Sequence, residues 1–248
     1  MKLLLLGGTR DAKNLAATLH AQGMTVIYSI AGLVRQPSLP CKVICGGFSR
    51  HGGLIPYIRD NHITGLINAT HPFAQKMTHT AERATAQTGI PYWRLQRPNW
   101  QPSTDDQWQH FADWETLLES LHSYSSIFLT QGQLSESMLI SLNQHRPPHQ
   151  QFIHRTAIKP NHASHHWMTW IQSIGPFSLE SELALFKKHR IDVLVSKHSG
   201  GALPAKLIAA RQLQIPVKLL QRPTVTASVA TYENIEDLVV AVSQARLA

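Results

Sequence analysis

The sequence predicts an α/β protein with two domains, each built on a parallel sheet. Three observations lead to this fold class. Short apolar runs alternate with amphipathic stretches, a glycine-rich turn follows the first apolar run, and a polar, proline-containing segment separates two regions with the same alternation. A chain that alternates strands and helices folds as a parallel sheet covered by helices on both faces. The length of 248 residues suits two domains that each bury a core.

The first domain is predicted from strand-length apolar runs and the amphipathic stretches between them. Gly7 and Gly8 interrupt the opening apolar run too early for a signal-peptide core, so we expect a buried first strand and a cytoplasmic protein. The predicted strands are 3–6, 25–30, 65–69 and 92–95, and the predicted helices are 11–22, 54–61 and 74–88.

The segment 96–113 interrupts this alternation. It is polar and contains Pro98 and Pro102, which is typical of a crossover between domains. We therefore predict an N-terminal cofactor-binding domain of residues 1–112 and a C-terminal domain of residues 113–248 that completes a substrate cleft. The second region contains predicted strands at 127–130, 152–155, 167–172, 193–196 and 216–220, a helix after Gly132, and helices at 178–189, 203–213 and 235–246.

The net charge favours an anionic ligand. Lysines and arginines number 23 and aspartates and glutamates 15, which gives a formal charge of +8. The longest basic run, 187–190, ends a predicted helix, where cations complement the helix dipole. Because the other basic residues are scattered, a polyanionic small molecule is favoured over nucleic acid. No apolar run approaches the ~20 residues that span a bilayer, so we expect no membrane partner, and we expect a monomer.

No metal site is expected from the cysteines and histidines. Cys41 and Cys45 are too few for a disulfide framework or a four-ligand zinc site. His162, His165 and His166 lie close together, but no carboxylate or cysteine pattern accompanies them, so we interpret this segment as an exposed loop.

A phosphate-binding turn is predicted after the first strand. Gly7, Gly8, Thr9 and Arg10 connect this strand to a helix, an arrangement that directs backbone N–H groups at a phosphate. The dinucleotide fingerprint G-x-G-x-x-G is only partial, because Thr9 and Ala12 occupy its second and third glycine positions. The alternative is a tight turn in a domain that binds no nucleotide.

The second predicted strand favours NADP over NAD. An NAD site usually has an acidic residue about 20 residues beyond the glycines, where it binds the ribose hydroxyls. Here the strand ends near Ser29, and Arg35 follows it, so a hydroxyl and a cation stand where the additional phosphate of NADP would need them. The alternative is that Arg35 faces solvent.

Thr70, His71 and Pro72 follow the third predicted strand, at the edge of the sheet where α/β folds bind ligands. Pro72 restricts His71 to an extended conformation. His71 is therefore a candidate both for contact with the cofactor and for acid catalysis, and the alternative is a hydrogen-bonded structural histidine.

The second domain contains a candidate anion-binding turn. Lys197, Ser199, Gly200 and Gly201 follow a predicted strand, and Lys206 lies in the next helix. Cations, a hydroxyl and a glycine turn together suit a carboxylate or phosphate. Lys197 is the predicted catalytic residue of this turn, and the alternative is a glycine turn with a solvated lysine.

Another turn in the second domain follows the strand at 127–130. Thr130, Gly132 and Gln133 are predicted to contact the substrate, because they end a strand at the same edge of the sheet as Lys197. The ligand-binding loops are together predicted to line a cleft between the two domains.

Taken together, these segments resemble the family of precorrin-6A and cobalt-precorrin-6A reductases, which belong to cobalamin synthesis. The matching segments include Thr-His-Pro-Phe-Ala at 70–74 and Lys-His-Ser-Gly-Gly at 197–201, and the others are 6–9, 29–32, 46–48, 94–98, 129–132, 175–177, 205–211 and 216–223. The resemblance implies two Rossmann-like domains with NADPH and a corrin precursor in the cleft between them. It also implies that hydride reaches one carbon of a conjugated C=C bond while its neighbour is protonated. It adds Gly32 to the cofactor site and gives the substrate several carboxylates.

Four positions depart from the pattern expected of this family. Gln131 and Gln133 stand where a threonine and often a basic residue are expected, Ile174 replaces a common arginine, and His198 replaces an aspartate or asparagine. Three interpretations remain: a cobalt-containing substrate, a rearranged carboxylate pocket, or sequence drift.

Three other function classes predict different sequence features or binding behaviour. A short-chain dehydrogenase requires Tyr-x-x-x-Lys, which does not occur in the sequence. A non-catalytic NADP-binding regulator would bind NADPH without oxidising it in the presence of a corrin precursor. A nucleic-acid binder would lose affinity for duplex DNA steeply with salt.

Overall fold

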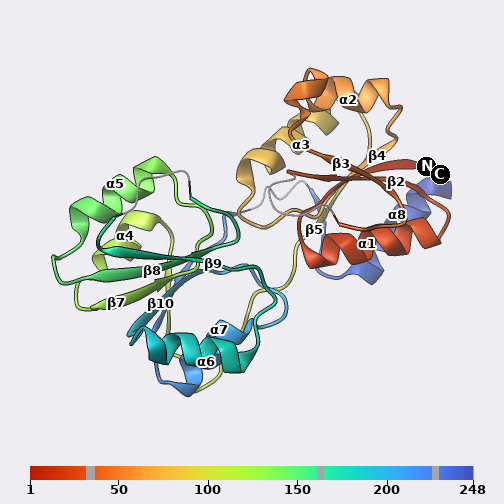
Figure 1. Ribbon diagram of the computed structural model, residues 1–248. Coiled ribbons are helices and arrows are strands. Elements are labelled where there is room, and N and C mark those ends of the chain that lie inside the picture. The colour runs from red at the N-terminus through yellow and green to blue at the C-terminus, as the bar shows by residue number, and fades with distance from the viewer. Residues whose placement is uncertain (32–36, 161–164, 225–228, 248) are drawn as a thin grey trace. The chain divides into compact units, whose positions relative to one another are not determined.

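The chain forms two units, each with its own parallel sheet. The computed structural model describes residues 1–31, 37–160, 165–224 and 229–247. One unit contains residues 1–98 and 223–248, and the other contains residues 99–222 (Figure 1). Each has a six-stranded sheet, and the strand pairings within both sheets are parallel. The predicted α/β class with Rossmann-like parallel sheets is confirmed.

Helices cover both faces of the sheet in the first unit. Its strands are β1 (Lys2–Leu6), β2 (Thr25–Ile30), β3 (Lys42–Cys45), β4 (Gly65–Asn68), β5 (Tyr92–Leu95) and β12 (Ala230–Tyr232). Its helices are α1 (Arg10–Ala21), the 3-10 helix η1 (Phe48–His51), α2 (Leu54–Asp60), α3 (Gln75–Thr88) and α8 (Ile235–Leu247). The strand order is β12-β5-β4-β1-β2-β3. The chain leaves β1 in one direction towards β2 and later returns to β4 on the other side, so β1 and β4 flank the point where such sheets bind ligands.

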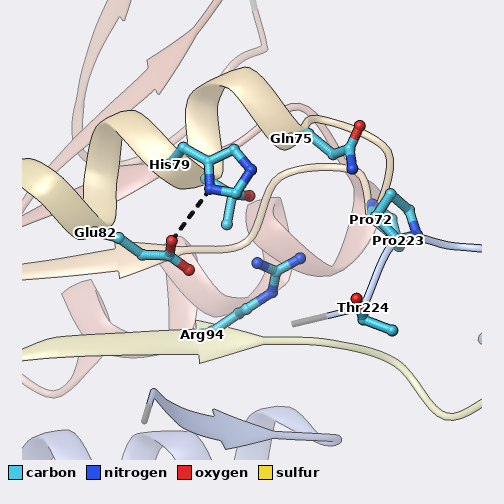
Figure 2. A pocket seen from close by; sticks show the side chains of 8 residues that line it. Pro72, Gln75, His79, Glu82, Arg94, Pro223 and Thr224 are labelled. Atoms are coloured by element: carbon cyan, nitrogen blue, oxygen red, sulfur yellow. Dashed lines mark ion pairs between the residues drawn. The ribbon is translucent and has the colours of Figure 1, made fainter. Parts of the chain in front are cut away.

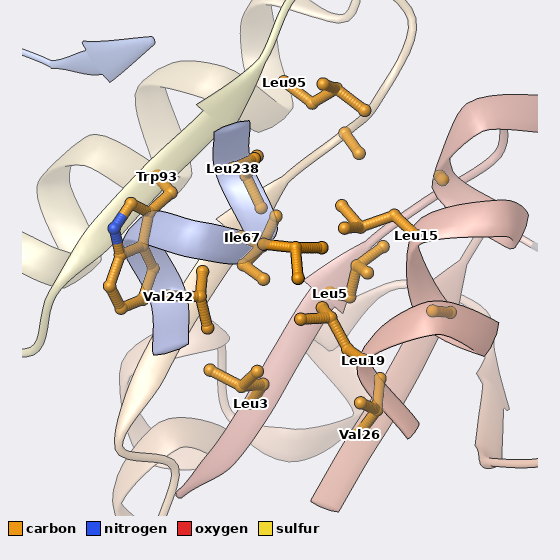
Figure 3. Close-up of a cluster of buried hydrophobic side chains, with 14 of the residues drawn as sticks. Leu3, Leu5, Leu15, Leu19, Val26, Ile67, Trp93, Leu95, Leu238 and Val242 are labelled. Atoms are coloured by element: carbon orange, nitrogen blue, oxygen red, sulfur yellow. The ribbon is translucent and has the colours of Figure 1, made fainter. Parts of the chain in front are cut away.

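The leucines of β1 are buried on both faces of the sheet. Leu3 and Leu5 pack with α1 and α8, and Leu4 and Leu6 pack with α2 and α3. Figure 3 shows the first of these clusters, in which side chains from α1 and α8 surround Leu3 and Leu5. Because successive side chains of a strand point to opposite faces, a central parallel strand needs an uninterrupted apolar run.

The second unit repeats this architecture. Its strands are β6 (Trp108–Phe111), β7 (Ser126–Leu129), β8 (Gln151–Thr156), β9 (Met168–Gln172), β10 (Val193–Lys197) and β11 (Val217–Leu220). Its helices are α4 (Trp114–Glu119), α5 (Glu136–His145), α6 (Leu179–Lys188) and α7 (Ala205–Gln212). The strand order is β6-β11-β10-β7-β8-β9. Leu117 and Leu142 bury α4 and α5 on one face, and Phe186 and Leu207 bury α6 and α7 on the other.

Side-chain caps fix where several helices begin. Thr9 accepts a hydrogen bond at the start of α1, and Asp113, Ser135 and Ser178 do the same for α4, α5 and α6. Each cap satisfies a backbone N–H that the helix itself leaves unpaired. Within the described ranges, no helix is both long and apolar enough to cross a membrane.

The division of the chain differs from the predicted boundary between residues 112 and 113. Strand β6 already belongs to the second sheet, where it pairs with β11. The end of the chain returns to the first unit, because β12 pairs with β5 and α8 buries Leu238 and Val242 in the first core. The apolar pattern of residues 235–246 predicts a helix, but it carries no information about which sheet that helix covers.

Candidate functional site

The predicted cofactor residues of the first unit meet at the carboxyl edge of its sheet. In the strand register, Leu6 at the end of β1 pairs with Ser29 of β2 and with Asn68 of β4. The turn at Gly7 and the loop at Thr70 therefore begin side by side. Parallel strands place all their carboxyl ends at one edge, which is why residues distant in sequence come together here.

The two glycines of the first turn serve different purposes. A side chain at Gly7 would overlap the ring of Tyr28, so this position is required for close packing. Gly8 has φ +113, a backbone conformation that favours glycine, and a Cβ built on it would meet no atom within 4 Å. The backbone N–H of Gly8 donates to the Tyr28 hydroxyl at 2.9 Å. Gly8 thus presents open space where a ligand can approach the backbone.

Tyr28 was not anticipated as part of the turn. It is fully buried in β2, and burial raises the pKa of its phenol, which keeps the hydroxyl protonated. Its position in an apolar strand is typical of core packing and carries no sign of a role in the turn. Only the pairing of β2 with β1 places its hydroxyl beneath Gly8.

Thr9 ties the start of α1 to the neighbouring loop. Its hydroxyl accepts from the backbone N–H of Ala12 at 3.1 Å and donates to the carbonyl oxygen of Ala69 at 3.0 Å. Both hydrogen bonds of the Thr9 hydroxyl are therefore made within the protein. They fix the start of α1 and so orient the backbone N–H groups of its first turn. Arg10, the first residue of α1, is exposed.

The residues predicted to select NADP are only partly described. Ser29 is 5% exposed, at the penultimate position of β2. Gly32 and Arg35 lie outside the described residues. Their assignment to the cofactor stays a prediction.

A buried asparagine holds the loop of Thr70, His71 and Pro72. Asn68 accepts from the Thr70 hydroxyl at 2.7 Å and from the Thr70 backbone N–H at 3.1 Å, while its amide donates to Thr78 and Tyr92. His71 is exposed, and its Nδ1 lies 3.3 Å from the backbone nitrogen of Phe73, which donates to it.

The loop itself is anchored by its proline. Pro72 is buried, whereas His71 beside it is exposed. This arrangement leaves the histidine ring at the surface of the site, and its catalytic role stays a prediction.

Arg94 is a second residue that the sequence alone did not single out. It lies in β5 and is only 6% exposed. Figure 2 shows its guanidinium in a small hollow that is also lined by Glu82 and Thr224. Glu82 forms an ion pair of 3.4 Å with His79, at the rim of the same hollow. The sequence does contain one sign of this site, which is a charged residue within an otherwise apolar strand. Buried arginines are rare unless they are paired or functional.

The predicted anion-binding turn of the second unit follows β10. Lys197 is partly buried, and burial lowers the pKa of its ammonium group. The backbone N–H of Ser199 donates to the Lys197 carbonyl at 2.9 Å. Gly200 and Gly201 have φ values of 69 and 80, so both positions need glycine. The turn therefore has the tight geometry that its sequence predicted.

Thr130 connects the two predicted turns of the second unit. Its hydroxyl donates to the carbonyl oxygen of Val195 at 2.9 Å and accepts from Lys206 Nζ at 2.7 Å. Burial, and then the positive charge of Arg155, lower the pKa of Lys206 to about 7, and Glu182 opposes this shift. The Lys206 ammonium group therefore loses its proton, and with it its positive charge, near neutral pH.

A buried ion pair lies beside Lys206 and was not predicted. Arg155 Nη2 and Glu182 Oε1 are 2.8 Å apart, with 8% and 1% of their side chains exposed. The Arg155 guanidinium also lies 4.8 Å from the ring centre of Phe128 and 3.8 Å from that of Phe177. No local sequence pattern links β8 to α6, so the sequence alone does not predict this pair.

The loop after Thr130 is held by β8 and by the segment that follows it. His154 Nε2 lies 2.8 Å from the carbonyl oxygen of Gly132, and the Gln133 amide donates to the carbonyl oxygen of Ile158 at 3.1 Å. Gln131 is 3% exposed, and its amide has no hydrogen-bond partner among the described residues. The Gln133 amide and the Gly132 carbonyl oxygen therefore have hydrogen-bond partners, whereas the Gln131 amide has none among the described residues.

Comparison with known proteins identifies the family. The family model described as precorrin-6x reductase CbiJ/CobK matches residues 2–243. A precorrin-6A reductase of Rhodococcus erythropolis is 37% identical over 238 residues, which are 94% of each chain. A cobalt-precorrin-6A reductase of Methanothermobacter thermautotrophicus is 29% identical over 96% of this chain and 82% of its own. A solved structure of CobK precorrin-6A reductase superposes with a TM-score of 0.87 at 32% identity, covering 98% of this chain and 96% of that one. The resemblance predicted from the sequence is thereby confirmed, and the chain belongs to the precorrin-6x reductase CbiJ/CobK family.

Proposed function

We propose that the chain is an oxidoreductase that uses NADPH to reduce one C=C bond of precorrin-6A, or of its cobalt-containing form, in cobalamin biosynthesis. The family match over nearly the whole chain carries this proposal. A reductase of this family requires a nicotinamide cofactor, and the choice of NADPH rests on Ser29 and Arg35, with no acidic residue at the end of the second strand.

The first unit has groups that fit a dinucleotide. The open space above Gly8 and the N-terminus of α1 suit a pyrophosphate, which Gly7, Gly8, Thr9 and Arg10 would hold. When bound, the nicotinamide supplies hydride to a carbon of the substrate. The remaining cofactor contacts are assigned to Ser29, Gly32, Arg35, Thr70, His71 and Pro72.

The second unit has groups that fit substrate carboxylates. Lys197 supplies positive charge, Lys206 adds to it when protonated, and Ser199 supplies a hydroxyl beside a turn rich in backbone N–H groups. The remaining substrate contacts are assigned to Thr130, Gly132, Gln133, Gly200 and Gly201. Lys197 and His71 are the candidates to stabilise developing charge or to deliver the proton that accompanies the hydride.

An anaerobic assay tests the reaction directly. Absorbance of NADPH should fall when metal-free or cobalt-containing precorrin-6A is added, and the better substrate shows the metal preference. NADH in the same assay should support a much lower rate. Binding of NADPH without consumption on either precursor would contradict the proposed reaction.

Replacing Arg35 by alanine is expected to erode the preference for NADPH. A charge-assisted contact to the 2′-phosphate is worth on the order of 1.5 to 3 kcal/mol. The Kd of NADPH should therefore rise about tenfold or more, as measured by calorimetry, while the Kd of NADH stays constant. Equal affinities for the two cofactors in the unmodified protein would refute the assignment.

Replacing Lys197 by alanine is expected to affect the substrate rather than the cofactor. Affinity for NADPH and the melting temperature should stay near those of the unmodified protein. The kcat/KM for the precursor should fall about tenfold or more, which corresponds to roughly 1.4 kcal/mol of transition-state stabilisation.

The neighbouring imidazole makes a double variant the stricter test of Lys197. His198, the next residue, could take over part of the role of Lys197, so Lys197→Ala is combined with His198→Ala. Turnover of the precursor at the unmodified rate by this double variant would show that the turn only packs.

A further inference from the structure

A cavity in the second unit borders the turn at Lys197 and Ser199, because His198, which lies between these two residues, is one of its lining residues. It has a volume of about 360 Å³ and is open to solvent. It is lined by Asn99, Trp100, Gln101, Pro102, His110, His198, Gln221 and Arg222. These lining residues include three basic side chains and no aspartate or glutamate. The cavity therefore has a chemistry that favours anions.

Two histidines reach this cavity from different strands. His110 lies in β6, and His198 follows β10, with β11 between the two strands. Their ring centres are 5.4 Å apart. The ring centre of Trp100 lies 5.1 Å from that of His198, and the rings of both pairs are tilted by 44°. Such packing fixes the orientation of the imidazole.

The electrostatic surroundings of His198 disfavour its charged form. It is 5% exposed, and burial lowers the pKa of its imidazole, followed by repulsion from His110. Arg222 lowers this pKa further, whereas hydrogen bonds with the backbone of His198 and Trp100 raise it. A bound anion would reverse this balance, because an opposite charge favours protonation.

Two simpler roles fit less well than anion binding. A metal site would need a further ligand, and the described residues include no group of three histidines, cysteines or acids suited to a metal. Pure core packing would not gather basic side chains without acidic partners, yet His110, His198 and Arg222 line this cavity and no aspartate or glutamate does.

We propose that this cavity binds a carboxylate side chain of the tetrapyrrole substrate through His110, His198 and Arg222. The identity of that ligand rests on the proposed function, whereas the affinity for carboxylates does not. Lys197 and Ser199 do not line this cavity, so it would fix the position of the macrocycle rather than take part in hydride transfer. Binding should be coupled to proton uptake by an imidazole.

The affinity for carboxylates is tested without cofactor or corrin precursor. Benzene-1,3,5-tricarboxylate serves as the probe, and NMR follows the ring protons of His110 and His198 through a pH titration. The probe should raise the pKa of at least one of these imidazoles. Because the protonated form binds the anion, affinity should rise as the pH falls from 8 to 6, by roughly fivefold or more.

Variants that keep an aromatic ring distinguish hydrogen bonding by the two imidazoles from their packing. His198→Phe and His110→Phe keep an aromatic ring at each position but remove its N–H groups, and they should weaken probe binding about tenfold. His149→Phe, at an exposed position of the same unit, is the matched control and should leave binding unchanged. Unchanged histidine pKa values in the presence of the probe, or equal effects of all three variants, would overturn the proposal.

Kinetics with the precursor then identify the ligand. His198→Phe should raise KM for precorrin-6A about tenfold with little change in kcat, and the tricarboxylate should inhibit competitively. Normal KM together with lost probe binding would overturn the assignment to the substrate. If the unmodified protein reduces no precursor, the proposed reaction fails, while the NMR result still decides whether the cavity binds carboxylates.

Discussion

Replacing Gly8 by valine is expected to abolish binding of NADPH. Gly8 has φ +113, which a β-branched residue adopts only with strain, and its Cβ would project into space that is open in this structure. If the cofactor pyrophosphate occupies that space, a side chain excludes it. The Kd of NADPH should rise by more than about a hundredfold, equivalent to roughly 2.7 kcal/mol. Calorimetry measures the affinity, and circular dichroism shows whether the variant is folded.

A second glycine provides the matched control for this experiment. Gly23 has φ +77, a Cβ there would also meet no atom within 4 Å, and it lies in the turn between α1 and β2, at the opposite edge of the sheet. Gly23→Val should therefore lower the melting temperature to a similar extent but retain NADPH binding. Normal affinity in a folded Gly8→Val variant would place the cofactor elsewhere.

Replacing Glu182 by alanine is expected to cause a large loss of stability. Its carboxylate is the anion paired with Arg155 inside the second unit, and it also favours the charged form of Lys206. Removal leaves a buried guanidinium without its counter-ion, which costs about 3 to 5 kcal/mol. Urea unfolding followed by tryptophan fluorescence should show the loss, since most tryptophans lie in this unit.

Two further variants isolate the cause of that loss. Glu180→Ala removes an exposed carboxylate from the same first turn of α6 and should cost less than about 1 kcal/mol. Arg155→Met combined with Glu182→Leu replaces both charges by apolar groups and should recover much of the stability. Equal losses for Glu180→Ala and Glu182→Ala would contradict a buried pair.

The turns of the candidate site were largely predictable because their chemistry is local. Gly8, Gly200 and Gly201 occupy conformations that favour glycine. A sequence in which a strand, a glycine turn and a helix follow one another predicts such positions. The N-cap of α1 at Thr9 follows from the same local pattern. By contrast, the roles of individual side chains around these turns depend on contacts with residues far away in the sequence, which a local pattern does not predict.

Three short strands were missed for a physical reason. β3, β6 and β12 form edges of their sheets, and none of their residues is fully buried. An edge strand of three or four residues has only one neighbour and little apolar surface to cover, so its sequence lacks the apolar run that marks β1 or β10, whereas the longer edge strand β9 was predicted. The return of residues 223–248 to the first unit was missed with them.

By itself, the sequence determined the α/β class, the parallel sheets, the glycine turns and the reductase family, because each depends on local periodicity or on short motifs in order. Only the tertiary structure decided which strands are neighbours. That decision places the Tyr28 hydroxyl beneath Gly8, pairs Arg155 with Glu182, and brings the ring of His110 into contact with that of His198. Contacts between residues far apart in sequence arise from strand order and register, and a single sequence has no periodic signal for either.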